Sequence, residues 1–471
     1  MNNNRPIVIM GGGPAGVFTA CGLVDLGYPA TIITRPRPFP AWEGISERPR
    51  TSLQHFGFTA ATASIGPMVT RAAHWNGQSQ AQNREYILNR QTFDQALLRD
   101  AEDKGVRIIH GRVERAVGQE GGWEISYVTS DAPPYQKIMI TADFLVDARG
   151  RESKLAKVDG RGGDIGEGDF TSGPATSALL KSYEVSLDLD AMTSVASFPK
   201  GWAWYLRDGA GTAILQIFIS SEKGELPPKA GLDQYFTELT RMLPECEAWL
   251  RGAIEQTSGV SVRTAAANRA TCAGGNNFLV VGDGALALDP LSGNGIFYAI
   301  GSGLSAAPVI NSLLKKPEDK DLALQFYQER IENSFKGGCL MGREFYAAEE
   351  RWPEEAFWKA RRLWPRGEEA SHPDPHSDIL LQPAEICKKP VVKDGFIALE
   401  DVIVTADHPR GVWKIDGIPL VKLMTFLATE KTDSETAATF GAEAAQVTSA
   451  RNWLLSRNIR PETYGKHNRE I

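Results

Sequence analysis

Residues 7–16 read Ile-Val-Ile-Met-Gly-Gly-Gly-Pro-Ala-Gly, a short apolar run followed at once by a glycine-rich turn. Four consecutive apolar residues rich in Ile and Val are typical of a buried parallel strand. Pro14 suits the first turn of a helix, because its missing N–H would have no partner there in any case. The stretch therefore predicts a strand, a tight turn and a helix that begins at the turn.

The glycines of this turn, Gly11, Gly13 and Gly16, have the spacing G-x-G-x-x-G. In such a loop the first glycine allows the turn, the second admits a pyrophosphate, and the third lets helix and strand pack closely. The first helical turn, with Pro14 and Ala15, would then lie against the phosphates. A Rossmann-like dinucleotide site is expected here.

The second strand of this unit, residues 30–34, lacks the usual terminal Asp or Glu for the ribose hydroxyls. It ends in Thr34, and Arg35 follows. Two interpretations stay open: Arg35 could favour a phosphorylated ribose, as in NADP, or Thr34 or a loop group could take over the ribose contact.

Composition excludes several classes of protein. The net charge of -7 and the pI near 5.7 argue against nucleic acid as a partner. We find no apolar run long enough for a signal peptide core or a spanning helix, so no membrane is expected. The five cysteines are scattered without a Cys-x-x-Cys pair, which predicts a reduced, cytoplasmic protein without a metal site.

Residues 278–300 read FLVVGDGALALDPLSGNGIFYAI, which is a strand, Gly-Asp, Asp-Pro, a glycine loop and a helix. This segment resembles the second FAD motif of the aromatic hydroxylase and flavin-dependent halogenase superfamily. The resemblance implies FAD as cofactor, reduced by NAD(P)H or another donor. It implies that Asp283 binds the ribityl or ribose region, and that the flavin ring lies against Pro290, Gly293, Asn294 and Gly295.

Two further segments match the superfamily in the expected order. Residues 86–98, YILNRQTFDQALL, resemble a helix start whose arginine, here Arg90, reaches the FAD. The alternative for Arg90 is a charge on an exposed helix face. Residues 144–156, FLVDARGRESKLA, resemble an Asp-Gly-x-x-Ser motif, but Arg149 replaces the aspartate of the hydroxylases. This departure weakens the inference that NAD(P)H docks there.

Residues 41–58, AWEGISERPRTSLQHFGF, lie where halogenases carry a glutamate-containing segment followed by a lysine. No lysine occurs from residue 1 to 103, which argues against halogenation. The segment 43–48 instead resembles the flavoproteins that modify tryptophan in quinoproteins carrying cysteine tryptophylquinone, including the monooxygenase that matures quinohemoprotein amine dehydrogenase. Residues 35–38 and 289–293 share this resemblance, and Arg48 is expected to contact the cofactor.

The catalytic residues are unknown from sequence, and three weak candidates remain. Glu43 and His55 are the titratable groups expected near a flavin pocket, although a surface or hydrogen-bonded structural role is equally open for each. Trp204 could line a substrate cavity, although aromatic residues at alternating strand positions are more often core.

The chain is expected to be an α/β protein with a Rossmann-like FAD-binding domain of the aromatic hydroxylase type, residues 1–170 and 260–364. Alternating residues after 182 predict an inserted β-sheet substrate domain, 171–259. A Pro-, Asp- and Ser-rich linker, 365–384, precedes a small winged-helix-like α+β domain, 385–471. About a dozen charges of each sign leave that domain without a basic face, so we expect protein or peptide docking rather than DNA binding.

Together these features predict an FAD-dependent monooxygenase that uses O₂, through a flavin hydroperoxide, to hydroxylate an aromatic group. The suspected substrate is a tryptophan side chain of a protein or peptide client, a quinoprotein subunit, during quinone-cofactor biogenesis. Two alternatives remain: a small-molecule hydroxylase, halogenase or reductase of the same superfamily, and a non-catalytic FAD-containing assembly factor.

Overall fold

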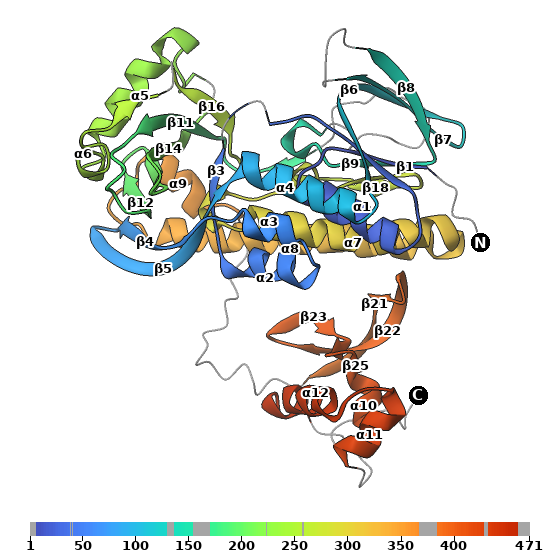
Figure 1. Cartoon of the computed structure of the whole chain (residues 1–471). Helices are drawn as coiled ribbons and strands as arrows, with labels where there is room; N and C mark the ends of the chain where they lie inside the picture. Colours follow the sequence, from blue (N-terminus) through green and yellow to red (C-terminus); the bar gives the residue numbers. More distant parts are fainter. Residues whose placement is uncertain are drawn as a thin grey trace. The chain divides into compact units, whose positions relative to one another are not determined.

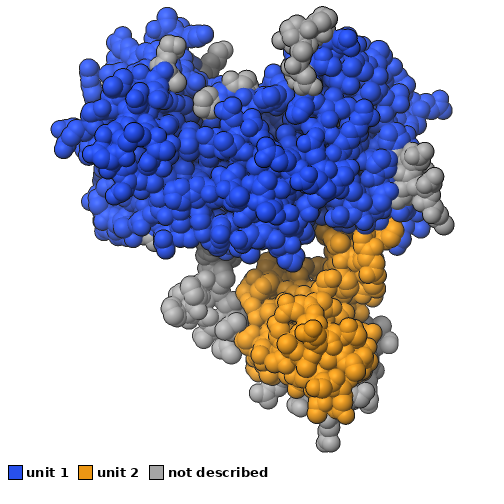
Figure 2. Space-filling view, in the orientation of Figure 1, with its two compact units in different colours: residues 1–320, 327–368 blue, residues 321–326, 369–471 orange. Residues whose placement is uncertain are grey.

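The computed structural model describes residues 6–37, 39, 41–129, 136–153, 170–222, 224–256, 259–366, 384–427 and 432–459 (Figure 1). The chain forms two compact units: residues 1–320 with 327–368, and residues 321–326 with 369–471 (Figure 2). Most of the predicted linker, 365–384, lies outside the described residues.

The first sheet of unit 1 is built on the strand that opens the chain. Strand β1 (Ile7–Met10) is fully buried and pairs in parallel with β2 (Ala30–Thr34) and β9 (Phe144–Asp147). The order of its eight strands is β18-β19-β9-β1-β2-β6-β7-β8. The remaining members are β6 (Arg107–Gln119), β7 (Gly122–Thr129), β8 (Lys137–Ala142), β18 (Gly274–Gly275) and β19 (Phe278–Val280). The predicted Rossmann-like sheet is confirmed, and β7 and β8 form an antiparallel ribbon at its edge.

Helices α1 (Pro14–Asp25), α4 (Arg90–Asp103) and α7 (Gly295–Lys315) belong to this layer (Figure 1). Helix α7 is long and apolar enough to cross a membrane, so the expectation that no run was long enough is wrong. Two thirds of its most apolar window is buried inside the protein, however. A Cβ at Gly303 would lie 2.6 Å from the Ala15 carbonyl oxygen, so α7 packs closely against α1. Its apolar character therefore fits a core helix.

The second sheet has nine strands and is not built from the inserted segment alone. Its order is β15-β11-β14-β13-β12-β4-β5-β3, with β16 paired to β11. The members are β3 (Trp42–Ile45), β4 (Met68–Trp75), β5 (Gln78–Asn89), β11 (Thr176–Glu184), β12 (Met192–Phe198), β13 (Gly201–Arg207), β14 (Thr212–Ser220), β15 (Ile254–Glu255) and β16 (Ser261–Thr264). Strand β4 joins the sheet through a parallel pairing with β12. Four strands from the ranges predicted for the FAD-binding domain, β3, β4, β5 and β16, thus complete the second sheet.

One face of this second sheet packs on α5 (Leu232–Arg241) and α6 (Glu245–Trp249) around an apolar cluster. On the other face the sheet curls. Trp42 of the edge strand β3 packs against an apolar cluster that contains Leu206 and Ile214 of the distant strands β13 and β14. Gln216 also donates a hydrogen bond to the Trp42 carbonyl oxygen at 3.4 Å. This face is therefore concave.

Short elements complete unit 1. A three-stranded sheet contains β10 (Phe170–Ser172), β17 (Asn268–Ala270) and β20 (Leu286–Ala287). The remaining helices are α2 (Glu47–His55), α3 (Thr59–Ala63), α8 (Lys320–Ala347) and α9 (Ala356–Arg362). Trp358 of α9 is fully buried and donates to the Phe198 carbonyl oxygen at 3.0 Å, which fixes α9 to the second sheet.

Unit 2 has its own apolar core, which includes Ile403, Leu423 and Val447. Its strands are β21 (Glu385–Lys393), β22 (Phe396–Thr405), β23 (His408–Val412), β24 (Lys414–Ile415) and β25 (Ile418–Pro419), and its helices are α10 (Leu420–Leu427), α11 (Asp433–Phe440) and α12 (Ala444–Ser456). The winged-helix topology stays a prediction.

Candidate functional site

In the glycine loop before α1, two glycines are packed closely against backbone atoms and the third faces open space. Gly11 has φ +113°, and a Cβ there would lie 2.4 Å from the Ala148 carbonyl oxygen. A Cβ at Gly16 would lie 2.1 Å from the Gly11 carbonyl oxygen. At Gly13 a Cβ would meet nothing within 4 Å, and among the described residues no side chain caps the helix. The first amides of α1 therefore face open space, as an anion site requires.

The second glycine segment meets the first at Ala15. A Cβ at Gly282, at the start of the 3-10 turn η4 (Gly282–Gly284), would lie 2.8 Å from the Ala15 Cβ. Ser302 of α7 accepts a hydrogen bond from the Gly282 amide at 3.0 Å. The structure thus brings together two motifs that are far apart in the sequence.

The start of α7 also faces open space. The turn η5 (Pro290–Ser292) leads into Gly293, which has φ +60°. A Cβ at Gly293 or Gly295 would meet nothing within 4 Å. Asn294 does not cap the helix with its side chain, which donates instead to the Ser292 carbonyl oxygen at 2.8 Å. A second set of helix amides is therefore available to a ligand.

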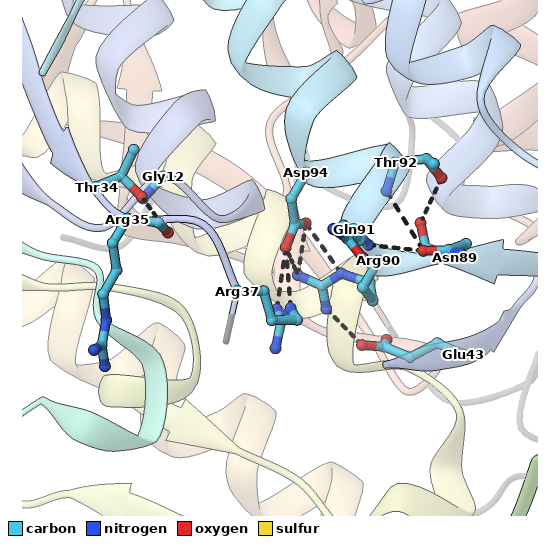
Figure 3. A network of polar contacts seen from close by, with 10 residues as sticks. All are labelled: Gly12, Thr34, Arg35, Arg37, Glu43, Asn89, Arg90, Gln91, Thr92 and Asp94. Atoms are coloured by element: carbon cyan, nitrogen blue, oxygen red, sulfur yellow. Dashed lines mark hydrogen bonds and ion pairs between the residues drawn. The ribbon is translucent and has the colours of Figure 1, made fainter. Parts of the chain in front are cut away.

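Thr34 and Arg35 have different environments. The Thr34 hydroxyl accepts a hydrogen bond from the Gly12 amide at 3.1 Å, which holds the glycine loop (Figure 3). Arg35 lies at the surface, where its guanidinium is 3.3 Å from Glu152. Arg35 is thus engaged by a carboxylate, which does not favour a bound 2′-phosphate.

Arg90 lies at the centre of a charged network (Figure 3). Its side chain is buried, which rules out the exposed helix charge considered above. It donates to Glu43 at 2.5 Å and to Asp94 at 2.9 Å, and Arg37 approaches Asp94 to 3.1 Å. Burial disfavours its charge, but the carboxylates of Glu43 and Asp94 outweigh burial and raise the pKa of Arg90. Sequence reasoning missed Asp94 and Arg37, although Arg37 stands in the Arg-Pro-Arg-Pro segment.

Asp283 lies near this network and is partly exposed. Its side chain keeps 44% of its surface exposed. Burial nevertheless raises the pKa of Asp283, partly offset by the Arg151 guanidinium at 3.9 Å. The charges of Glu43 and Arg90 also act on this carboxyl, so the network is close enough to influence the pKa of Asp283. Arg151, which donates to the Ala266 carbonyl oxygen at 2.6 Å, was not singled out from the sequence.

The open amides at α1 and α7 and the accessible Asp283 fit the FAD that the motifs imply. The α1 amides would hold the pyrophosphate, and Asp283 would accept hydrogen bonds from ribityl or ribose hydroxyls. The α7 amides would face the ring and favour negative charge on its reduced form. Arg48 is exposed near this helix start, with its guanidinium 5.8 Å from the Phe297 ring centroid.

The other two catalytic candidates, besides Glu43, are His55 and Trp204. His55 is exposed at the end of α2, where its ring contacts Phe56 edge-on. Trp204 is half-buried on the concave face of the second sheet. It packs in one cluster with Leu291 of the glycine segment. Trp204 and Leu291, which belongs to the segment expected to contact flavin, therefore border the same apolar cluster, whereas no described contact links His55 to that region.

Arg149 has a structural partner that explains the departure from the hydroxylase motif. Asp147, at the end of β9, is fully buried. Arg149 holds it with two hydrogen bonds, at 2.8 and 2.7 Å, and Ser153 donates to it at 2.7 Å. The arginine neutralises a buried charge here, so its presence requires no cofactor.

Comparison with known proteins places this site in a family. The family model described as tryptophan halogenase matches residues 42–372, more than two thirds of the chain. A tryptophan 2-halogenase of Chondromyces crocatus is 25% identical over 77% of this chain and 71% of its own length. The putative FAD-dependent oxidoreductase LodB of Marinomonas mediterranea is 24% identical, over 77% of this chain and 98% of its own.

A solved structure extends the similarity to nearly the whole chain. It is the structure of the peptidyl tryptophan dihydroxylase QhpG, essential for tryptophylquinone cofactor biogenesis. It is 34% identical, covers 96% of this chain and 99% of its own, and superposes with a TM-score of 0.77. The open glycine loops, the accessible Asp283 and these matches agree: the chain belongs to the tryptophan halogenase family of FAD-dependent oxidoreductases.

Proposed function

We propose that this protein is an FAD-dependent monooxygenase that hydroxylates a tryptophan side chain of a protein or peptide client. The observation that carries the proposal is the similarity to the peptidyl tryptophan dihydroxylase, which extends over 96% of the chain. The aromatic concave face beside the glycine segment supports it, because such a face suits an indole ring.

The bound cofactor supplies the oxygen chemistry, and the protein supplies binding and orientation. The α1 amides around Gly13 bind the pyrophosphate, and Asp283 accepts hydrogen bonds from the sugar hydroxyls. Glu43 and Asp94 hold the Arg90 guanidinium in one position near Asp283. The curled sheet excludes water from the ring that is to be hydroxylated.

Two alternative functions remain in the proposal. A small-molecule hydroxylase, halogenase or reductase would use the same cofactor site. The absence of lysine before Lys104 counts against halogenation by the usual route of the family. An FAD-containing assembly factor would bind the client without oxidising it. The electron donor, NAD(P)H or another reductant, is left open by the residues described.

We also propose that the client is a quinoprotein subunit met in the cytoplasm and that unit 2 docks it. A small-molecule hydroxylase needs no second unit with its own core. Deleting residues 379–471 should leave FAD bound and reducible but abolish oxygen transfer to the client, through failed binding. Modification of the client at the normal rate by the truncated protein would contradict the docking role.

The experiment that tests the function starts from the native cell. The holoenzyme is used to capture its client, and mass spectrometry then looks for oxygen gained on a tryptophan of that client. Oxygen uptake with client and reductant separates a catalyst from an assembly factor, which would consume none. Efficient hydroxylation of free tryptophan or a simple phenol would instead favour the small-molecule alternative.

A further inference from the structure

We propose that Tyr346 is a positioning residue for the flavin: its hydroxyl holds the Asp289 carboxylate, and Asp289 holds the loop that leads into α7. The inference goes beyond the proposed function, because it rests on FAD as the cofactor and not on any client. Asp289 precedes the turn η5 and the open residues Gly293 and Gly295, the loop against which the flavin ring is expected to lie.

Asp289 shapes this loop through its backbone. The Oδ1 atom of Asp289 accepts a hydrogen bond from the Leu291 amide at 3.0 Å, which caps the turn η5. The chain then reverses at Gly293, which has φ +60° and whose amide donates to the Pro290 carbonyl oxygen at 3.0 Å. The open amides at the start of α7 follow directly. The position of the Asp289 carboxylate therefore helps to set where those amides point.

Tyr346, near the end of α8, holds this carboxylate. The Tyr346 hydroxyl oxygen lies 3.0 Å from each of the two Asp289 oxygens. Burial and the charge of Asp289 raise the pKa of Tyr346 well above its ordinary value, so the hydroxyl stays protonated and donates. Burial also raises the pKa of Asp289, and the Leu291 amide, Arg361 and the Tyr346 hydroxyl partly offset that rise. Each of these donors and charges favours the ionised carboxylate.

The second sheet holds the same tyrosine from the other side. The Nε1 atom of Trp202 donates a hydrogen bond to the Tyr346 hydroxyl oxygen at 3.1 Å. Trp202 is buried in β13 and stacks on Phe218 of β14, with ring centroids 3.9 Å apart and ring planes 13° apart. All three rings belong to the apolar cluster that Trp204 and Leu291 border. Tyr346 thus accepts one hydrogen bond from the sheet and donates one to the flavin loop, which fixes the loop against the sheet.

Tyr205 provides a comparison within the same sheet. A buried tyrosine needs a partner for its hydroxyl, and a backbone carbonyl is sufficient. Tyr205 is fully buried in β13, and its hydroxyl donates to the Trp249 carbonyl oxygen at 2.9 Å. Tyr346 differs because its acceptor is the side chain that caps the flavin loop. Replacement by phenylalanine removes a buried hydrogen bond at either position, but only at Tyr346 does the loss reach that loop.

The expected consequence concerns the reduced form of the cofactor. The α7 amides lie at the positive end of the helix dipole, and reduction of the flavin adds negative charge. A loop that Tyr346 no longer holds would present these amides less well. The protein would then lose more affinity for reduced FAD than for oxidised FAD, so the midpoint potential of the bound flavin would fall.

The test measures the midpoint potential of FAD in the holoenzyme at about pH 8, well above the ordinary pKa of aspartate. Tyr346→Phe should weaken the binding of reduced FAD about tenfold more than that of oxidised FAD, which lowers the potential by about 30 mV for a two-electron couple. Asp289→Asn should not lower it, because the amide oxygen can still accept from Leu291 and Tyr346 while the negative charge is lost. Tyr205→Phe, the matched control, should keep the wild-type potential.

An unchanged or higher potential in Tyr346→Phe, or an equal fall in Tyr205→Phe, would overturn the role of Tyr346. If Tyr346→Phe binds no FAD, Trp202→Phe replaces it, since that change removes the donor to the Tyr346 oxygen. It should lower the potential by a smaller amount, and an unchanged potential would overturn the role. No client takes part in these measurements, so their failure leaves the proposed function standing. The expected potentials without any oxygen added to a client would overturn only the proposed function.

Discussion

Helices α1 and α7 of unit 1 both begin at glycine-rich loops, but the glycines of the two loops have different surroundings. At α1, Gly11 and Gly16 are packed against backbone, and only Gly13 faces open space. At α7, Gly293 and Gly295 both face open space. The close packing that α7 needs is provided by a glycine within the helix, Gly303. The difference separates glycines that the fold requires from glycines that a ligand requires.

The largest effect is expected where a fold glycine of α1 gains a side chain. Gly16→Ala places a methyl group 2.1 Å from the Gly11 carbonyl oxygen, which forces the loop to move. The free energy of unfolding of the apoprotein should fall by about 3 kcal/mol or more. Urea unfolding measures this free energy. A variant as stable as the wild type would show that the fold does not require a glycine at residue 16.

Gly13→Ala should affect the cofactor and spare the fold. The methyl group meets no protein atom within 4 Å but occupies the space in front of the α1 amides. We expect FAD affinity to fall by about 10- to 100-fold, which corresponds to about 1.4–2.8 kcal/mol. The unfolding free energy of the apoprotein should change by less than about 1 kcal/mol. Titration of apoprotein with FAD gives the first quantity, and unchanged affinity would show that the pyrophosphate binds elsewhere.

Asp283→Asn should weaken FAD binding by about tenfold, because a neutral acceptor replaces a charged one. The same change has a pH-dependent effect on the apoprotein. Since burial raises the pKa of Asp283, this carboxyl contributes its full stability below the ordinary pKa of aspartate and loses it as the pH rises through the folded-state pKa. The Asn variant should therefore be at least as stable as the wild type near pH 7.

The direction of this pH effect is checked by measuring the unfolding free energy of both apoproteins at neutral and mildly acidic pH. The stability gap between Asp283→Asn and wild type should narrow as the pH falls toward about 4. A gap that widens toward acid would mean that the folded protein stabilises the ionised carboxylate, contrary to the burial described above.

The smallest effect is expected at the second helix start. Gly295→Ala adds a methyl group in open space at the first residue of α7, and alanine favours a helix more than glycine does. The apoprotein should gain up to about 0.5–1 kcal/mol of stability. FAD binding should suffer less than in Gly13→Ala. Unfolding measured with and without FAD gives both the stability of the apoprotein and the strength of FAD binding. A loss of apoprotein stability would contradict the open space described at Gly295.

Local patterns predicted much of this fold. The buried strand at residues 7–10 is a continuous apolar run, and the strand at 30–34 is rich in Ile. The bounds of α11 follow from its cap at Thr432 and from Gly441. The second sheet was only half predicted, because β4 joins it through a pairing with β12, more than a hundred residues away. No local pattern specifies such a partner.

Some residues of the candidate site could likewise be predicted from local sequence, and others could not. The glycines and Asp283 belong to compact motifs and were found from them. Asp94 and Arg151 are single charged residues whose importance comes from distant partners, such as Arg37 for Asp94 and the Ala266 carbonyl oxygen for Arg151.

The central claim, that bound FAD serves to oxygenate a protein tryptophan, is tested most directly with isotopically labelled O₂. The captured client is incubated with reductant and with either the wild-type holoenzyme or the Gly13→Ala protein, and its tryptic peptides are analysed by mass spectrometry. We predict labelled oxygen on a client tryptophan with the wild type, and strongly reduced label with Gly13→Ala at limiting FAD. A client that binds the FAD-loaded wild type and is recovered without labelled oxygen would contradict the account.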